Sequence, residues 1–276
     1  MGEHEIKNTP LVATGVFKEE FGLLSVFIKD ESSNPFGSIK DRRNAYIIRE
    51  ATKLKVDKLV LITSGNNGYS LACFAKGSDT KVVSIVNKEL PEEIKNRIKE
   101  VSYQVLELNL DHKIMRPEEL VAFAREREDE VIWEVTNGYE ENYIPILAEI
   151  IKEKVKPNYI VVPLGSGGIF IGMVEAVERY GLDTKVIGIG CQNTLHSLAD
   201  KLCTPWTPYV KAIQNYQQKG HIIYRLTEDE IRNVFKKYKN SMDCEHSSSV
   251  VCMAPQIHRF KKTDTIILLN SGRLKH

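Results

Sequence analysis

The sequence predicts an α/β fold with a mainly parallel sheet, because short apolar runs alternate with amphipathic stretches along all 276 residues. The apolar runs are rich in Val and Ile, which is typical of strands that are buried on both faces. Glycine-rich turns lie where several of these runs meet helices. Ligands of such folds bind at the carboxyl ends of strands, so we expect a functional site at these turns.

The strands and helices are expected in alternation along the chain. The expected strands are residues 58–63, 81–86, 104–108, 131–135, 159–164, 185–190, 221–226 and 265–270. Thr227 and Glu230 form a capping box, which predicts a helix to about residue 239. Pro91 is expected at the first position of a helix over 91–100, and Ser38 is expected to cap a helix that ends at about residue 52. Further helices are expected over 69–76 and from 169 onward.

Charge and composition argue against several classes of partner. The chain has 38 Lys and Arg against 37 Asp and Glu, so it lacks the positive charge that binds nucleic acid or an anionic membrane. No window holds the roughly 18 consecutive apolar residues of a membrane span, and the polar N-terminus does not resemble a signal peptide. The five cysteines contain no C-x-x-C pair, so we expect reduced thiols in a cytoplasmic protein. The histidines and cysteines show no metal-ligand spacing, so no metal is expected.

The first turn that could carry chemistry has the sequence Asn34-Pro35-Phe36-Gly37-Ser38-Ile39-Lys40-Asp41-Arg42. Lys40 falls in the first turn of the expected helix, where the positive end of the helix dipole disfavours an ammonium ion and lowers its pKa. A lysine with a lowered pKa can form an imine with an aldehyde and can later act as a base. The alternative interpretation is a solvated lysine on a helix face.

The second turn lies between a strand and a helix and has the sequence Thr63-Ser64-Gly65-Asn66-Asn67-Gly68. It offers hydroxyls, amides and backbone N–H groups at a helix N-terminus, which suits the binding of a carboxylate. The alternative is an ordinary capped turn.

The third turn consists of Gly165, Ser166, Gly167 and Gly168, between a strand and the helix that starts at Ile169. Glycines let backbone N–H groups close around a phosphate, and the helix dipole favours the anion. The turn is not a dinucleotide fingerprint, which would need glycine at Phe170, and no G-K-[ST] follows as in a P-loop. The alternative is a tight strand-to-helix turn.

Together and in this order, the three turns resemble those of the fold-type II enzymes that use pyridoxal 5′-phosphate (PLP), namely threonine synthase, cysteine synthase and serine/threonine dehydratase. The resemblance runs from Asn8-Thr9-Pro10-Leu11, similar to the family's TPL start, to Asn270-Ser271-Gly272. It implies a tryptophan synthase β-like fold of two α/β domains with PLP in the cleft between them. The small domain is expected over about 37–127, and the large PLP-binding domain over 1–36 and 128–276. The resemblance also implies a small amino-acid substrate and a homodimer.

The resemblance assigns the cofactor-binding residues one by one. Lys40 would hold PLP as a Schiff base and then move the α-proton of the substrate. The four residues Gly165, Ser166, Gly167 and Gly168 would hold the cofactor phosphate, and Asn66 would hydrogen-bond the 3′-oxygen of the pyridine ring. Ser271, or Asn270 if the alignment shifts by one, would hydrogen-bond the pyridine nitrogen. A neutral hydroxyl there leaves the nitrogen unprotonated, which suits β- or γ-elimination.

The substrate-binding residues are assigned in the same way. Thr63, Ser64 and Asn67 would hold the substrate carboxylate. Glu134 lies where cysteine synthases place a carboxylate-binding Gln, and a second carboxylate there would repel that of the substrate. Arg42 and Arg43 are either ligands of a leaving phosphate or surface charges.

The motifs divide between branches of the family. Lys29-Asp30-Glu31, Glu245-His246-Ser247-Ser248-Ser249 and Leu274-Lys275 resemble threonine synthases, although His246 replaces a usual proline. The turns T-S-G-N-N-G and G-S-G-G are more similar to those of cysteine synthases and dehydratases. We favour threonine synthase-like elimination and replacement on O-phosphohomoserine. The alternatives are β-replacement on O-acetylserine or O-phosphoserine, a serine/threonine dehydratase, and a PLP-binding protein without turnover.

Overall fold

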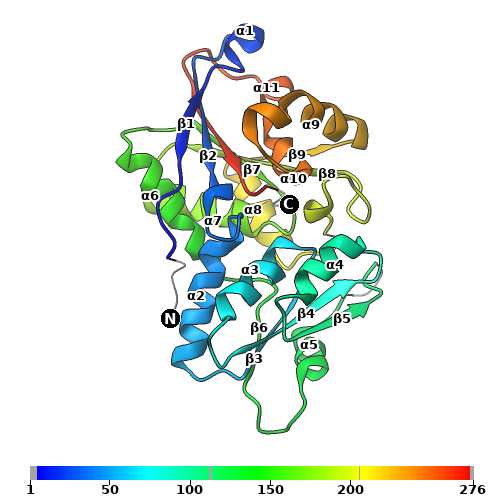
Figure 1. Ribbon diagram of the computed structural model, residues 1–276. Helices are drawn as coiled ribbons and strands as arrows, with labels where there is room; N and C mark the ends of the chain where they lie inside the picture. The colour runs from blue at the N-terminus through cyan, green and yellow to red at the C-terminus, as the bar shows by residue number, and fades with distance from the viewer. Residues whose placement is uncertain (1–4, 112–113, 205, 274–276) are drawn as a thin grey trace. The chain divides into compact units, whose positions relative to one another are not determined.

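The computed structural model describes residues 5–111, 114–204 and 206–273. The chain divides into two compact units (Figure 1). Unit 1 contains residues 40–138 and the start of the chain up to Ile6, and unit 2 contains residues 7–39 and 139–276. The sequence predicts a small functional domain over about residues 37–127, and these limits stay a prediction.

Unit 1 is built on a four-stranded parallel sheet with the order β5-β4-β3-β6. Its strands are β3 (Lys58–Ile62), β4 (Lys81–Asn87), β5 (Gln104–Leu108) and β6 (Ile132–Glu134). Its helices are α2 (Lys40–Lys53), α3 (Asn66–Ala75), α4 (Glu92–Lys99) and α5 (Pro117–Ala124). Helices α2 and α3 pack against each other (Figure 1). The parallel order brings the carboxyl ends of β3 and β6 together, which positions the turn 63–68 beside the residues after β6.

Unit 2 is built on a six-stranded sheet with the order β1-β2-β10-β7-β8-β9, in which only the β1–β2 pair is antiparallel. Its strands are β1 (Leu11–Thr14), β2 (Ser25–Asp30), β7 (Tyr159–Pro163), β8 (Lys185–Cys191), β9 (Ile222–Leu226) and β10 (Thr265–Asn270). Its α-helices are α1 (Lys18–Phe21), α6 (Ile144–Lys152), α7 (Gly168–Arg179), α8 (Val210–Gln218), α9 (Glu228–Met242), α10 (His246–Ser249) and α11 (Ala254–Ile257). Its 3₁₀ helices are η1 (Glu31–Ser33), η2 (Glu140–Tyr143), η3 (Asp200–Leu202) and η4 (Val250–Met253).

The two faces of the unit 2 sheet are buried in separate cores. Ile160 and Val162 of β7 pack in one core with residues of α6 and α7. Val161, between them in sequence, packs in the other core with residues of α9 and η4. Successive side chains of a strand point to opposite faces, so a continuous apolar run is required when helices cover both.

The structure confirms the predicted α/β class and all eight expected strands, each within one residue at either end. Two further strands, β1 and β2, were not expected. The capping box is present, since the Thr227 side chain accepts from the Glu230 amide and Glu230 from the Thr227 amide. The expected cap at Ser38 is wrong. Ser38 pairs with Gly272 in an isolated bridge, its buried Oγ has no hydrogen-bond partner among the described residues, and α2 begins only at Lys40.

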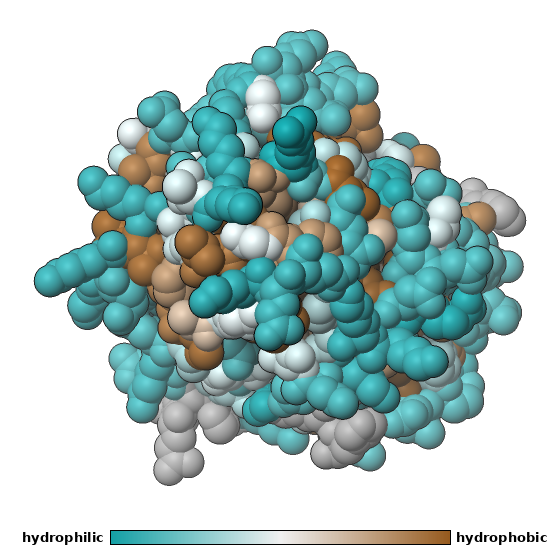
Figure 2. Space-filling view, turned by 90° about the horizontal axis from the view of Figure 1, so that it is seen from above, coloured by the Kyte–Doolittle hydropathy of each residue, from teal (hydrophilic) through white to brown (hydrophobic). Residues whose placement is uncertain are grey.

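The surface shows hydrophilic side chains with scattered apolar patches in the view from above (Figure 2). In the described ranges, no helix is long and apolar enough to cross a membrane. The same residues contain no group of three or more His, Cys, Asp or Glu side chains that could hold a metal ion. The motif residues Leu274 and Lys275 lie outside the described residues.

Candidate functional site

In unit 1, Thr63 shapes the turn that follows β3. Its buried Oγ1 accepts hydrogen bonds from the amides of Gly65 (3.1 Å) and Gly68 (2.9 Å). Gly65 has φ 144°, a conformation that strongly favours glycine. A Cβ atom at Gly68 would lie 2.5 Å from Thr63 Cγ2, so a larger residue there would push the turn apart. The hydroxyl of Thr63 therefore forms hydrogen bonds within the turn.

Asn67 is held in this turn by a residue that sequence reasoning missed. Asn44 Nδ2, from α2, donates to the Asn67 carbonyl at 3.0 Å. The buried Oδ1 atoms of both asparagines have no hydrogen-bond partner among the described residues. Buried acceptors without partners are costly, and functional sites are where they are tolerated. Asn44 stands four residues after Lys40, and this helical i,i+4 spacing is the signal that could have identified it.

Lys40 is the first residue of α2, as expected, and is partly buried. The preceding residue, Ile39, donates its amide to the Ser271 carbonyl at 2.9 Å. The residue before α2 is therefore hydrogen-bonded to the residue that follows β10.

Arg43 is buried, which excludes one of the two roles considered for it. Its guanidinium is buried and donates to the carbonyls of Val135 (2.5 Å) and Thr136 (3.1 Å). Both Arg42 and Arg43 are buried, so the interpretation as surface charges is wrong. The contacts of Arg43 instead fix α2 to the segment after β6.

Glu134 ends β6 and pairs in register with Val60 of β3. Its carboxylate accepts the amide of Thr136 at 2.7 Å, and Thr136 Oγ1 accepts the amide of Ile62 at 2.9 Å. Glu134 is therefore part of the same edge of the sheet as the turn 63–68. Its carboxylate adds negative charge on that edge.

In unit 2, the turn 165–168 joins β7 to α7 and lies close to its neighbours. A Cβ atom at Gly165 would lie 3.2 Å from the Lys201 carbonyl oxygen. At Gly167, which has φ +107°, a Cβ atom would lie 2.8 Å from Ile213 Cδ1. Helix α7 has no side-chain N-cap, and no residue in the described ranges accepts a hydrogen bond from the amides of Ser166, Gly167 or Gly168.

The segment from Thr207 into α8 covers this turn. Thr207 Oγ1 donates to the Ser166 carbonyl and accepts the amide of Tyr209 at 3.2 Å. The Tyr209 hydroxyl donates to the carboxylate of Glu140. These contacts bring one hydroxyl and one carboxylate to the start of α7.

Ser271 and Asn270 are the two candidates for hydrogen bonding to the pyridine nitrogen. Their side chains differ in burial and in hydrogen-bond partners. Ser271 Oγ lies 2.8 Å from Ser248 Oγ and is partly exposed. Asn270 is buried, and its Nδ2 donates to Asp30 Oδ1 at 2.9 Å. Ser271 thus has the more accessible polar group.

The segment 245–249 lies beside Ser271. Ser248 also donates to the Gly272 carbonyl at 3.0 Å, and Glu245 forms an ion pair with Lys201 Nζ at 3.3 Å. Burial lowers the pKa of Lys201, but attraction to Glu245 and Asp200 outweighs it, so the pKa lies above its ordinary value. His246 stacks on Phe235 with ring centroids 3.7 Å apart, and burial lowers its pKa.

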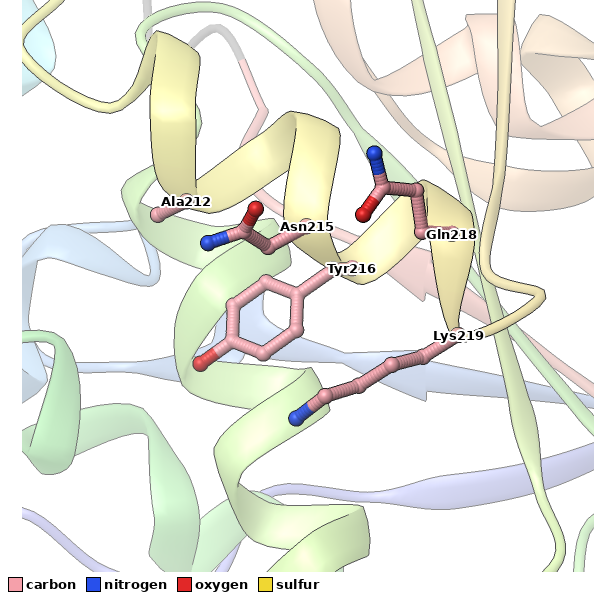
Figure 3. A pocket seen from close by; sticks show the side chains of 5 residues that line it. All are labelled: Ala212, Asn215, Tyr216, Gln218 and Lys219. Atoms are coloured by element: carbon pink, nitrogen blue, oxygen red, sulfur yellow. The ribbon is translucent and has the colours of Figure 1, made fainter.

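A hollow of about 460 Å³ lies on α8 and is lined by Ala212, Asn215, Tyr216, Gln218 and Lys219 (Figure 3). Lys219 points toward α7, where it pairs with Glu178 at 2.6 Å. None of the predicted site residues lines this hollow. It therefore does not correspond to the predicted site.

The turn 165–168 fits a phosphate group. Cβ atoms at Gly165 and Gly167 would crowd neighbouring atoms, and the amides of the turn have no acceptor in the described part of the chain. The start of a 12-residue helix adds a positive dipole end. In unit 1, the buried Asn67 Oδ1 provides a polar atom that could meet a ligand. The residues present are compatible with a phosphorylated cofactor and an amino-acid ligand.

Comparison with known proteins agrees with this chemistry. The family described as "Pyridoxal-phosphate dependent enzyme" matches residues 3–272. A cysteine synthase of Helicobacter pylori is 25% identical over 174 residues, which are 60% of this chain and 57% of that protein. A catabolic L-threonine dehydratase of Staphylococcus aureus is 22% identical over 255 residues, which are 84% of this chain and 72% of that protein. The chain therefore spans little more than half the length of the first of these relatives.

A solved structure supports the fold. The O-acetylserine dependent cystathionine beta-synthase of Helicobacter pylori superposes with a TM-score of 0.82, over 97% of this chain and 93% of that chain. The identity is 18%, so this similarity concerns the fold alone. It confirms the fold class expected from the sequence.

Proposed function

Because the chain belongs to the pyridoxal-phosphate dependent enzyme family, we propose that it holds PLP on Lys40 and catalyses elimination or replacement on a hydroxy-amino acid derivative. PLP is the cofactor of this family, which includes lyases and transferases. When bound, PLP withdraws electrons from the α-carbon of the amino acid and so acidifies its α-proton.

Backbone amides and two polar side chains are the proposed cofactor-binding groups. The amides of the turn 165–168 would hold the phosphate. Asn66 would hydrogen-bond the 3′-oxygen of the ring, and Ser271 would hydrogen-bond the pyridine nitrogen. Asn270 is less suited to that last role, because its side chain is buried against Asp30. Lys40 would carry the cofactor and afterwards move the α-proton of the substrate, as a lysine amine can do once it is uncharged.

The observation that carries the type of reaction is the Ser271–Ser248 hydroxyl pair. The two Oγ atoms are 2.8 Å apart, and no carboxylate accepts a hydrogen bond from Ser271 in the part of the chain that the structure describes. Hydroxyls do not stabilise a protonated pyridine nitrogen as a carboxylate would. A neutral ring favours departure of a leaving group over reactions that need the full electron sink.

The substrate carboxylate would be held by the turn 63–68. Ser64 and Asn67 are the direct ligands in this proposal, since both are partly exposed. Thr63 would act through the turn, because its hydroxyl already accepts the amides of Gly65 and Gly68. The negative charge of Glu134 near this edge would favour substrates that bring little further negative charge.

We favour a leaving group on the β-carbon. The guanidinium of Arg43, considered as a ligand of a leaving phosphate, already donates to two backbone carbonyls. The curated relatives reported above are a cysteine synthase and a threonine dehydratase. Serine, threonine and O-acetylserine are therefore the first substrates to test.

A threonine synthase-like reaction is the second candidate. The segment 245–249, which resembles that branch, contacts Ser271 through Ser248. This contact would give the segment a direct influence on the ring end of the cofactor.

Turnover assays separate the two candidates. The purified protein with PLP is incubated with serine, threonine, O-acetylserine plus sulfide, O-phosphoserine plus sulfide, and O-phosphohomoserine. We expect 2-oxo acid and ammonia, or cysteine, from a substrate with a β-leaving group. Threonine formed only from O-phosphohomoserine would support the second candidate. Absence of turnover with all five substrates would contradict both candidates.

The homodimer and the cytoplasmic location implied by the sequence stay predictions. Sedimentation equilibrium of the PLP-loaded protein tests the first, with a mass of twice 31.4 kDa expected. Cell fractionation tests the second.

A further inference from the structure

The start of α7 has a carboxylate beside it that belongs to another element. Glu140 is the first residue of η2, and a Cβ atom at Gly168 would lie 3.5 Å from its Oε1 atom. Helix α7 has no acidic residue in its own first turn. The carboxylate at this helix end is thus supplied by η2.

Packing fixes Glu140 in this position. Gly172, one turn further along α7, lies so close to η2 that a Cβ atom there would be 2.5 Å from the Glu140 carbonyl oxygen. The Tyr209 hydroxyl donates to Glu140 Oε1. The carboxylate is therefore held by the backbone and by a hydroxyl, and does not move freely as a surface side chain would.

Within the described ranges, Glu140 forms no ion pair that would neutralise its charge. Among the described residues, no Lys, Arg or His lies within ion-pair distance of its carboxylate. Burial raises the pKa of Glu175 on α7, and repulsion from Glu140, Glu141 and Glu178 adds to this. A fixed negative charge therefore lies where the proposed function puts the cofactor phosphate.

We propose that Glu140 sets the affinity for PLP by repelling its phosphate, so that the cofactor binds more weakly than the turn 165–168 alone would allow. The proposal rests on the proposed function, which assigns this turn to the phosphate. Two negative charges close together near a protein surface repel each other. The Tyr209 hydroxyl partly offsets the charge of the carboxylate by hydrogen bonding, and it keeps the carboxylate beside Gly168.

The substitution Glu140→Gln tests this directly. Gln keeps an oxygen that can accept from Tyr209 and has nearly the same shape, so the packing against Gly172 is retained. The matched control is Glu141→Gln, which removes the same charge from the adjacent, exposed residue. Full-length wild type and both variants are freed of cofactor with hydroxylamine and titrated with PLP, and binding is followed by visible absorbance.

We expect Glu140→Gln to bind PLP about three- to tenfold more tightly than wild type, as removal of one nearby like charge predicts. The gain should shrink as salt is raised, because ions screen the repulsion. Pyridoxal, which lacks the phosphate, should bind wild type and Glu140→Gln equally. Glu141→Gln should match wild type with both probes.

Three results would overturn the inference. Equal or weaker PLP binding by Glu140→Gln would show that the charge does not oppose the phosphate. The same gain with pyridoxal, or with Glu141→Gln, would show that the effect is not specific to phosphate and Glu140. If wild type itself bound no PLP, the proposed function would fail, and the inference would fail with it. If wild type binds PLP but Glu140→Gln shows no gain in affinity, only the inference fails.

Discussion

Thr63 illustrates how one side chain can determine a binding turn without touching the ligand. Its buried hydroxyl accepts two amides of the turn 63–68, and its methyl group packs where a Cβ atom at Gly68 would be. The sequence placed Thr63 among the ligands of the substrate carboxylate. Its hydrogen bonds favour an indirect role, in which it holds Ser64 and Asn67 in position.

Thr63→Val should therefore lower both stability and substrate affinity. The shape is kept, but two buried amides lose their acceptor, and an unsatisfied buried group costs about 1–3 kcal/mol. Urea unfolding should show a lower free energy of unfolding, and steady-state kinetics a higher KM. Thr63→Ser, which keeps the hydroxyl, is the control and should lose much less. A Val variant as stable as wild type, with an unchanged KM, would contradict this account of the turn.

At the scale of elements, the start of α7 depends on glycine for conformation and for space. Gly167 has φ +107°, and Ile213 leaves no room for a Cβ atom. Gly181, after the end of the same helix, has φ +61° but nothing within 4 Å of a Cβ atom. The two glycines share the left-handed conformation and differ in their surroundings.

Gly167→Ala should weaken PLP binding by about tenfold, since a left-handed alanine costs roughly 1–2 kcal/mol and the turn would have to move. Gly181→Ala should lose a similar amount of stability without a change in PLP affinity. Titration with PLP and thermal unfolding of both variants provide the measurement. Equal PLP affinity in the two variants would argue against the turn 165–168 as the phosphate site.

The elements that sequence patterns predicted well are the buried parallel strands. Runs such as that of β7 are apolar on both faces because helices cover both, and this signal is strong in one sequence. Strands β1 and β2 escaped prediction. Strand β1 is partly or fully exposed along its length. In β2 only Val26 and Lys29 are buried, and Lys29 pairs with Glu149 at 2.5 Å. A charged residue in a strand hides the apolar pattern, and its partner is 120 residues away.

The candidate site was predictable only in part. Its glycine-rich turns and Lys40 are local signals, because each lies within a few residues of a helix start. The partners of these turns are not local. Asn44, Ser248 and Glu140 come from other elements, and only the fold brings them to Asn67, Ser271 and Gly168 respectively.

At the scale of the whole molecule, each unit holds a buried group whose pKa depends on folding. In unit 1, backbone hydrogen bonds and the Lys58 ammonium outweigh burial and lower the pKa of Glu130 from 4.5 to about 2. In unit 2, burial lowers the pKa of His221 from 6.5 to about 4, and its Nδ1 accepts the amide of Val186 at 3.0 Å. Both groups bind protons more readily in the unfolded chain.

Stability should therefore fall in acid in two steps. The contribution of His221 is complete above pH 6.5 and is lost as the pH falls toward 4, and that of Glu130 is complete above 4.5 and is lost toward 2. Unfolding by urea across this range gives the curve. His221→Asn should make the slope between pH 6.5 and 4 shallower, with the remainder contributed by His246 and His258, whose pKa values are also lowered by burial. If the variant and wild type had parallel curves there, His221 would not be the group responsible.

The attachment of PLP to Lys40 is the central claim, and one experiment tests it most directly. The purified protein is supplied with PLP, its visible spectrum is recorded, and it is reduced with borohydride and digested for peptide mapping by mass spectrometry. We expect a yellow protein with a pyridoxyl group on Lys40, and no such band or label in Lys40→Ala. A protein that stays colourless with PLP, or a label on another lysine, would contradict the account.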